Sequence, residues 1–379
     1  MLRTTDLDYT LPPELVATEA TEPRDAARLM VVGDNSACSH RYVRDLPDIL
    51  EAGDLLILNV TRVLQARFRG VRRDSRGRVE GLYLGERDRC AQRGPVWSVL
   101  IRARRQAPGV VIDLWDGMEL DAGINLTLVQ RDPEEHGAWL ARVAQADGSP
   151  VQSAASLLDR VGLTPVPPYI VAARKRARLA PDDARDRARY QTVYAEVPRG
   201  GSVAAPTAGL HFTPELLDAL ARRGVGTAPT VLHVGTGTFK EVETEFVESH
   251  PMHREWFELP AATARRILEV RARGGRIVAV GTTSARTLES CPSLDDAAEH
   301  GASGWTNLLI TPGHRWAHTD ALMTNFHMPR TTLLAMVAAR LPGGLAQLRT
   351  IYQEAIRERY RFYSYGDAML ILPPRSLRQ

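Results

Sequence analysis

Cysteine is scarce in this chain, which contains three cysteines in 379 residues. Cys38, Cys90 and Cys291 lie far apart, so they form neither a CxxC pair nor the dense spacing of a disulfide-stapled domain. A zinc site built on a cysteine cluster is therefore excluded. An odd and sparse set of cysteines is typical of a reducing compartment, which predicts a cytoplasmic protein.

Long hydrophobic runs are absent as well. The dense apolar stretch at residues 55–58 has the length of a strand, whereas a membrane-spanning helix needs ~18 apolar residues or more. The first nine residues turn acidic at once and carry no apolar signal region, so we expect neither export nor a membrane partner. A length of 379 residues with 44% hydrophobic and 25% charged side chains indicates a globular protein of two domains.

Lysine is nearly missing, since Lys175 and Lys240 are the only two and arginine supplies the other basic side chains. The overall charge of +3 decides little, but two stretches are locally basic. Residues 67–78 carry six arginines against one aspartate, a net of +5, and residues 174–189 carry seven basic residues against three aspartates, a net of +4. Such stretches attract polyanions, although a solvated loop would have the same composition.

The pattern of apolar and turn-forming residues changes twice along the chain. Up to residue 65, and again from residue 159, strand-like runs and helical periods occur as in an α/β domain. Between residues 66 and 158, short apolar runs alternate with Gly, Pro and Asp turns, a pattern typical of a small antiparallel barrel or sandwich. We therefore predict a mixed α/β main domain (residues 1–65 and 159–379) interrupted by an inserted small β-barrel-like domain (residues 66–158).

Local signals place several helix starts and turns. Thr213 followed by proline predicts the start of a helix that ends near Gly224. The apolar run at residues 277–280 predicts a strand, and the Gly-Thr-Thr at 281–283 predicts a turn into another helix. A strand–turn–helix of this kind suits a carboxylate or phosphate, although it also simply turns the chain.

Two histidines stand next to glycine-containing turns. His211 lies beside Gly209 just before a predicted helix, where free backbone N–H groups favour an anion. His233 precedes the turn that holds Gly235 and Gly237, but no GxGxxG is completed and the following residues do not indicate a helix. A nucleotide loop is therefore only weakly indicated there.

Two more histidines occur in polar clusters. His250, His253 and Glu255 form the pattern HxxHxE, in which Pro251 argues against a regular helix and thus against a metal-binding pair. General base or hydrogen-bond donor is the better interpretation, because the pKa of histidine lies near working pH. His327 follows Asn325 at the end of an apolar stretch, which indicates a pocket wall or a hydrogen-bonded core histidine.

Twelve short blocks, taken in sequence order, span nearly the whole chain. They are residues 8–12 (DYTLP), 24–29 (RDAARL), 53–59 (GDLLILN), 61–63 (TRV), 167–170 (PPYI), 189–195 (RYQTVYA), 203–212 (VAAPTAGLHF), 232–239 (LHVGTGTF), 250–255 (HPMHRE), 279–283 (AVGTT), 324–329 (TNFHMP) and 360–369 (YRFYSYGDAM). Together they resemble one family, the S-adenosylmethionine:tRNA ribosyltransferase-isomerase of queuosine biosynthesis. Each block alone is a weak signal, but the ordered series is specific.

The resemblance implies an α/β domain interrupted by a β-barrel, in agreement with the change of pattern. It also implies a reaction in which the ribosyl part of S-adenosylmethionine moves to the aminomethyl group of a 7-deazaguanine at the tRNA wobble position. Epoxyqueuosine forms, and adenine and methionine leave. S-Adenosylmethionine and tRNA are then the partners, the former a consumed cosubstrate rather than a true cofactor. We expect no metal and a monomer.

Such a reaction needs a base beside the sulfonium, an acid for the departing adenine, donors that position the ribose, and a cationic surface for tRNA. The candidates for proton transfer are His211, His233, His253, His327, Glu255 and Asp367. The candidates for substrate binding are Asn59, Thr61, Arg62, Tyr169, Thr207, Gly209, Gly235, Gly237, Thr282, Thr283 and Asn325. The candidates for tRNA binding are Arg174, Lys175, Arg176 and Arg178. The assignment of base and acid stays open.

Two positions depart from the family pattern, which usually has a polar residue at Val60 and proline at Gln65. A non-catalytic RNA-binding relative is therefore the alternative, and release of adenine separates it from an enzyme. A zinc-dependent tRNA-guanine transglycosylase is excluded, because the chain has neither a cysteine-rich zinc cluster nor a repeating (β/α)₈ pattern.

Overall fold

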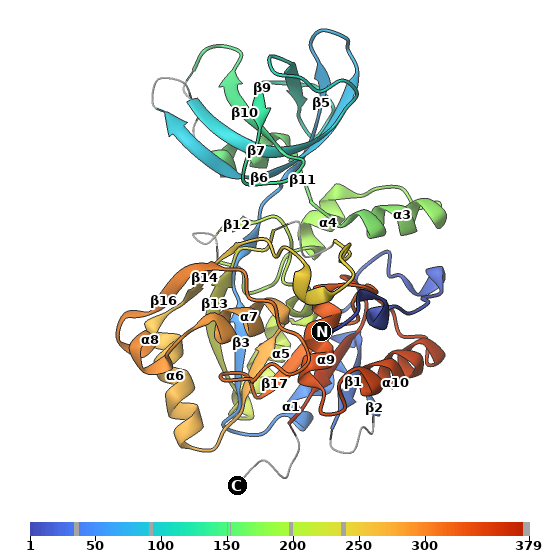
Figure 1. Cartoon of the computed structure of the whole chain (residues 1–379), viewed down its shortest axis with the longest axis vertical. Helices are drawn as coiled ribbons and strands as arrows, with labels where there is room; N and C mark the ends of the chain where they lie inside the picture. The colour runs from blue at the N-terminus through green and yellow to red at the C-terminus, as the bar shows by residue number, and fades with distance from the viewer. Residues whose placement is uncertain are drawn as a thin grey trace.

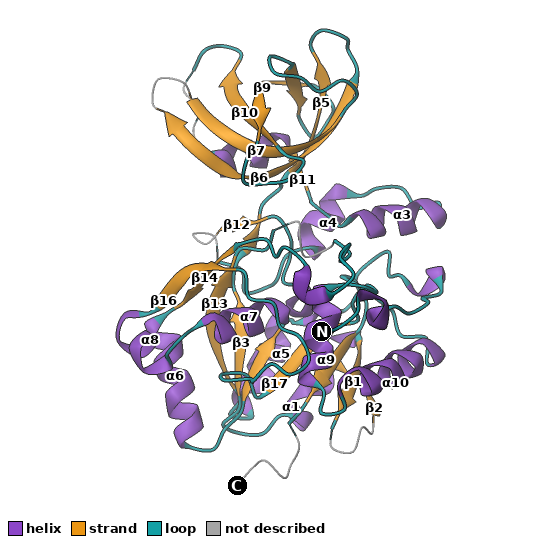
Figure 2. Cartoon of the chain, viewed as in Figure 1, coloured by secondary structure: helices purple, strands orange, loops and turns teal. Residues whose placement is uncertain are grey.

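The computed structural model describes residues 1–33, 38–90, 94–149, 151, 153–196, 200–235 and 240–373. Figure 1 shows a body of sheet and helices that holds both ends of the chain, and a barrel of strands set apart above it. In Figure 2, helices α3 (Pro168–Arg176) and α4 (Asp183–Arg189) lie between the two. The predicted fold class, a mixed α/β body interrupted by a β-barrel, is confirmed.

The large body is built on a nine-stranded sheet. Its order is β16 (Ala302–Thr306), β14 (Glu255–Leu259), β13 (Gly226–Leu232), β3 (Leu55–Asn59), β15 (Ile277–Val280), β17 (Ala321–Asn325), β18 (Ala368–Ile371), β1 (Arg28–Val32) and β2 (Cys38–Tyr42). The four central strands β13, β3, β15 and β17 are parallel, and the strands next to them on both sides are antiparallel. All five residues of β3 are buried, as the continuous apolar run predicted for a strand covered on both faces.

Alternate side chains of the central strands enter two different cores. Leu56 and Leu58 pack with helices α1 (Leu46–Ile49) and α5 (Pro214–Arg222) on one face. Leu55 and Ile57 pack with α6 (Ala261–Ala272), α7 (Thr282–Ser290) and α8 (Leu294–His300) on the other. Because side chains alternate along a strand, this sheet needs apolar residues at every position of its centre.

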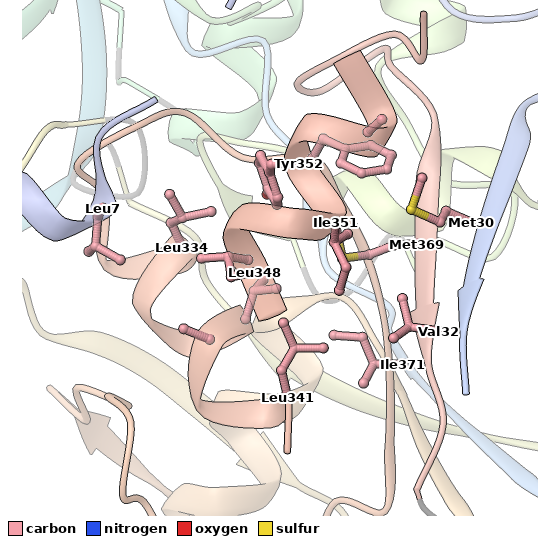
Figure 3. Packing of buried hydrophobic residues seen from close by; sticks show 14 of the residues in the cluster. Leu7, Met30, Val32, Leu334, Leu341, Leu348, Ile351, Tyr352, Met369 and Ile371 are labelled. Carbon is pink, nitrogen blue, oxygen red and sulfur yellow. The ribbon is translucent and has the colours of Figure 1, made fainter. Parts of the chain in front are cut away.

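A third core lies where the carboxyl-terminal helices cover β1 and β18. Figure 3 shows Met30, Val32, Met369 and Ile371 gathered on one side, with Leu334 of α9 (Thr332–Arg340) and Leu348, Ile351 and Tyr352 of α10 (Gly344–Arg357) beside them. Thr213 caps α5 as predicted, since its hydroxyl accepts a hydrogen bond from the amide of Leu216 at 3.1 Å.

The barrel consists of six antiparallel strands that close on themselves. Their order is β5 (Arg67–Arg72), β6 (Arg78–Cys90), β7 (Gly94–Arg102), β10 (Trp139–Gln145), β9 (Asp121–Arg131) and β8 (Val111–Trp115), and β8 pairs back with β5. Phe68, Trp97 and Leu126 are among the side chains that fill the interior. Helix α2 (Ala154–Val161) packs on this core, and β11 (Gly162–Leu163) pairs with β5. The division at residues 65/66 and 158/159 stays a prediction.

The two bodies are joined by short elements near the carboxyl ends of the parallel strands. Strand β4 (Arg62–Val63) leaves β3, pairs with β12 (Gly200–Ser202) and leads into the barrel. After α4, the chain returns to the sheet through β12 and the 3₁₀ helix η7 (Thr207–His211). Within the described residues, no helix combines the length and the apolar character needed to span a membrane.

Candidate functional site

A cleft of about 580 Å³ opens beyond the carboxyl ends of β15 and β17, and we call it the central cleft. Open α/β sheets commonly bind ligands at this edge, because loops of neighbouring strands converge there. The polar and aromatic residues that line the central cleft are Tyr169, Thr207, Thr282, Thr283, Thr324, Asn325, Phe326, His327, Thr331, Tyr363 and Ser364. Six predicted site residues thus meet in one cleft.

The turn from β15 into α7 supplies one wall of the central cleft. Gly281 has φ +93°, a backbone conformation that L side chains rarely adopt, and its amide donates to the carbonyl of Met323 at 2.8 Å. Thr282 and Thr283 then form the first turn of α7, where the leading N–H groups have no partner within the helix. The buried hydroxyl of Thr283 has no hydrogen-bond partner among the described residues. This wall therefore offers donors to a ligand.

Asn325 is held in place from two sides. Its side-chain oxygen accepts a hydrogen bond from the hydroxyl of Thr207 at 2.9 Å, and its side-chain nitrogen donates to the carbonyl of Tyr363 at 3.1 Å. The ring of Tyr363 packs against the ring of Tyr169 with centroids 4.9 Å apart, and the hydroxyls of Tyr169 and Ser364 are hydrogen-bonded. The cleft therefore has a rigid polar floor beside aromatic surface, an arrangement suited to a nucleoside.

His327 lies just beyond β17, with 8% of its surface exposed. Its Nε2 is 2.7 Å from the hydroxyl of Thr324, and its backbone amide donates to the hydroxyl of Tyr352 at 2.9 Å. Burial lowers the pKa of His327 to about 3. The imidazole is therefore neutral near pH 7 and offers one N–H and one lone pair.

A second cleft adjoins the first through the shared wall residue Leu333, and we call it the side cleft. Glu255 and Arg286 form a buried ion pair in its wall, and the amide of Gly235 donates to the other carboxylate oxygen of Glu255 at 2.9 Å. Two predicted residues, Gly235 and Glu255, are thus in direct contact.

His253 lines the side cleft and also contacts the barrel. Its Nδ1 lies 3.4 Å from Oε1 of Glu135, which belongs to the loop between β9 and β10. The hydrogen bond with His253 is the main cause that lowers the pKa of Glu135. His253 therefore contacts the barrel as well as the sheet.

A third cleft of about 1180 Å³ runs between barrel and sheet, and we call it the barrel-facing cleft. His233, Gly235, His253 and Glu255 line it together with Tyr83 of the barrel. The His233 ring packs so closely on Gly201 that a Cβ there would come within 2.7 Å of the ring, and burial lowers the pKa of His233. These residues face the barrel rather than the central cleft.

Two predicted proton-transfer residues, His211 and Asp367, hydrogen-bond to the backbone, and their catalytic roles stay predictions. His211 is buried, and its two ring nitrogens lie 3.0 and 2.9 Å from the carbonyl oxygens of Ala208 and Gly366. The carboxylate of Asp367 accepts the backbone amides of Arg28 and Arg361 at 3.0 and 2.8 Å. Neither residue lines any of the three clefts.

The predicted substrate residues around β3 are buried or bonded to neighbouring strands, and their role in substrate binding stays a prediction. The amide of Asn59 spans β3 and β13, donating to the carbonyl of Leu232 at 3.0 Å and accepting the amides of Leu232 and Thr61 at 3.2 Å. Thr61 is fully buried, and Arg62 belongs to the short strand β4. The group that approaches Gly209 most closely is the hydroxyl of Tyr194, which would lie 1.9 Å from an added Cβ, and the predicted role of Gly209 in substrate binding stays a prediction.

The basic stretch before α4 divides into one internal and three external residues. The guanidinium of Arg174 binds both carboxylate oxygens of Asp186 at 2.5 and 2.6 Å and donates to the carbonyl of Thr18 at 3.0 Å. The charge of Arg174 is therefore paired within the protein, and its predicted contact with tRNA stays a prediction. Lys175, Arg176 and Arg178 are exposed at the end of α3.

Gly237 lies outside the described residues, so its predicted role is not addressed by the structure. Arg286, Tyr363 and Ser364 are among the cleft residues that the sequence interpretation missed. Arg286 could have been found, because residues three and four positions apart on a helix share a face and Thr282 and Thr283 were already candidates. Within the described part of the chain, no group of three or more His, Cys, Asp or Glu side chains is placed to hold a metal ion.

Comparisons with known proteins cover almost the entire chain. The model of the queuosine biosynthesis protein family matches residues 4–371. A protein of Gloeobacter violaceus called S-adenosylmethionine:tRNA ribosyltransferase-isomerase is 46% identical over 98% of this chain and 96% of its own length. A protein of the same name from Phenylobacterium zucineum is also 46% identical, over 98% of this chain and 99% of its own length. The crystal structure of S-adenosylmethionine tRNA ribosyltransferase from Thermotoga maritima is similar with a TM-score of 0.51 and 33% identity, covering 97% of this chain and 100% of that one.

Proposed function

The chain belongs to the queuosine biosynthesis protein family, and we propose that it is an S-adenosylmethionine:tRNA ribosyltransferase-isomerase that binds its cosubstrate in the central cleft. It transfers the ribosyl part of S-adenosylmethionine to the aminomethyl-deazaguanine of tRNA. The resemblance expected from the ordered sequence blocks is confirmed by the family match over residues 4–371.

One observation supports the position of the site most strongly. Thr282 and Thr283 at the start of α7, Asn325 after β17, and Tyr169 from α3 line a single cleft although they come from distant parts of the sequence. The donors on α7 and the amide of Asn325 suit ribose hydroxyls, and the paired rings of Tyr169 and Tyr363 offer a surface for adenine.

The candidates for proton transfer lie in two different clefts, the central cleft and the barrel-facing cleft. His327 is the histidine of the central cleft, and as a neutral imidazole it serves as a hydrogen-bond partner or a short-lived base at the ribose. Glu255, His253 and His233 line the barrel-facing cleft, where we place the deazaguanine of the tRNA. Lys175, Arg176 and Arg178 supply exposed positive charge beside the barrel for the phosphate backbone. We also propose that the protein acts as a monomer in the cytoplasm.

The test uses purified protein, S-adenosylmethionine and tRNA that carries the aminomethyl-deazaguanine at the wobble position. We expect adenine and methionine to appear in equal amounts with the modified nucleoside. Formation of S-adenosylhomocysteine, or methylation of the RNA, would refute this assignment. Binding of tRNA without any release of adenine would instead identify a non-catalytic relative.

A further inference from the structure

Arg286 lies in the wall of the side cleft, and one nitrogen of its guanidinium group has no hydrogen-bond partner among the described residues. Its Nη1 pairs with Oε2 of Glu255, and its Nε donates to the carbonyl of Leu308 at 3.2 Å. Its Nη2 has no hydrogen-bond partner in the part of the chain that is described, although the residue is only 6% exposed. A buried cationic nitrogen without a partner is costly, so a ligand that supplies an anionic oxygen gains a strong hydrogen bond there.

The position of Arg286 relates the two clefts to each other. Thr282 and Thr283 lie in the wall of the central cleft, and Arg286, one turn further along α7, lies in the wall of the side cleft. One turn of a helix advances ~5.4 Å, which is comparable to the distance from a ribose to the far end of an amino-acid chain attached to it. Leu333 lines both clefts, so the two clefts lie against the same side chain.

The rest of the side cleft suits an apolar chain with charges at its end. Five apolar residues contribute to the wall besides Leu333, namely Met252, Leu308, Leu309, Ile310 and Met336. Glu255 places a carboxylate next to Arg286, so the same wall presents one negative and one positive group. An amino-acid end carries the complementary pair, an ammonium and a carboxylate.

We propose that the side cleft holds the methionyl half of S-adenosylmethionine, with its carboxylate on Nη2 of Arg286 and its ammonium toward Glu255. This inference rests on the proposed function and adds the group that selects the cosubstrate. Arg286 recognises the carboxylate, the apolar wall surrounds the methylene groups, and the ribose stays at Thr282 and Thr283.

The first experiment alters the ligand and leaves the protein intact. Wild-type enzyme is given S-adenosylmethionine or its decarboxylated analogue, with the same modified tRNA, and kcat/KM is measured for both. We expect the analogue to be poorer by about 10- to 100-fold, mainly through KM, because it lacks a charge-assisted hydrogen bond. Equal kcat/KM for the two would overturn the inference while leaving the proposed function intact. No turnover of either would refute the proposed function instead.

The second experiment assigns the discrimination to Arg286. Arg286→Lys keeps the charge beside Glu255 but removes the fork of the guanidinium, so the preference for the carboxylate should fall to within about 3-fold. Arg276→Lys is the matched control, because Arg276 also sits in a buried ion pair, with Asp54, and is 7% exposed at the opposite end of β15. The control should keep the wild-type preference. An unchanged preference in Arg286→Lys would contradict the inference.

Leu309→Trp provides a test that does not touch the ion pair. The larger ring narrows the side cleft, so KM for S-adenosylmethionine should rise by about 10-fold or more while the affinity for adenosine stays within about 3-fold. Loss of adenosine binding together with S-adenosylmethionine binding, or an unchanged KM in the folded variant, would place the methionyl chain elsewhere. This result decides the matter even if Arg286→Lys fails to fold.

Discussion

The buried neutral histidine of the central cleft makes the stability of the protein depend on pH in a calculable way. Burial lowers the pKa of His327 to about 3, whereas a histidine in an unfolded chain titrates near ~6.5. Between these two values the unfolded state binds a proton that the folded state does not, so stability falls as pH falls. One proton changes the free energy of unfolding by ~1.4 kcal/mol per pH unit, or ~2 kcal/mol between pH ~6.5 and pH ~5.

The assay compares wild type with His327→Gln by urea unfolding at several pH values between about 5 and 8. Other histidines whose pKa values are lowered by burial, such as His211 and His233, contribute equally to both proteins. The variant should therefore lose ~2 kcal/mol less than wild type between pH ~6.5 and pH ~5. His300→Gln, which removes a histidine with 80% of its side chain exposed, is the control and should follow wild type. Identical pH dependence in wild type and His327→Gln would refute the argument.

Three further predictions concern residues outside the clefts. Replacing Lys175, Arg176 and Arg178 with serine should weaken tRNA binding. The slope of the logarithm of the tRNA-binding constant against the logarithm of salt concentration should become shallower by up to ~0.9 for each phosphate that is no longer bound. The affinity for S-adenosylmethionine should stay unchanged, and an unchanged salt slope would contradict the prediction. Arg174→Ala should instead lower the free energy of unfolding by ~3–5 kcal/mol, measured in urea, because it leaves Asp186 buried without its partner. His211→Ala should lower the melting temperature and leave kcat of the folded enzyme within ~10-fold of wild type, so a stable but inactive variant would return His211 to the catalytic residues.

The sequence was most informative where one local pattern determines the structure. The apolar run of β3 and the change of pattern near residue 66 indicated the covered sheet and the barrel, because burial on one or two faces sets the period of apolar residues. The Gly-Thr-Thr after β15 likewise indicated a turn into a helix, because glycine readily adopts φ +93° at Gly281 and the helix begins directly after it. In both cases the residues that carry the signal belong to the structural element that they predict, or adjoin it in the sequence.

The sequence was least informative where the hydrogen-bond partner lies far along the chain. His211 bonds to Gly366, which is 155 residues away, and the carboxylate of Asp367 bonds to the amide of Arg28, which is 339 residues away. A polar residue in a well-matched block has the same appearance whether it faces a ligand or the backbone of another strand. Folding alone decides between the two, because most buried polar groups find their hydrogen-bond partners only in the folded chain.

Val60 shows how the same reasoning changes a prediction about a position that departs from the family. An acidic residue there would at first sight restore a catalytic group, but Val60 is 4% exposed and lines none of the three clefts. Its backbone amide donates to the carbonyl of Thr230 at 2.9 Å, and its carbonyl accepts the amide of Glu196 at 2.9 Å. The residue therefore joins two segments in the interior rather than meeting substrate.

We accordingly expect wild type to be active and Val60→Asp to be less stable, because a carboxyl group without a partner in that interior costs at least ~2 kcal/mol. Val60→Thr is the matched control, since threonine keeps the shape of valine and adds a hydroxyl. It should lose ~1–2 kcal/mol of stability and retain kcat/KM within about 3-fold. Urea unfolding and steady-state kinetics on the three proteins distinguish an effect on stability from an effect on catalysis. If the wild-type protein is inactive and Val60→Asp is active, the side chain at position 60 reaches the reacting atoms. The interior position of Val60 would then not be its position in the working enzyme.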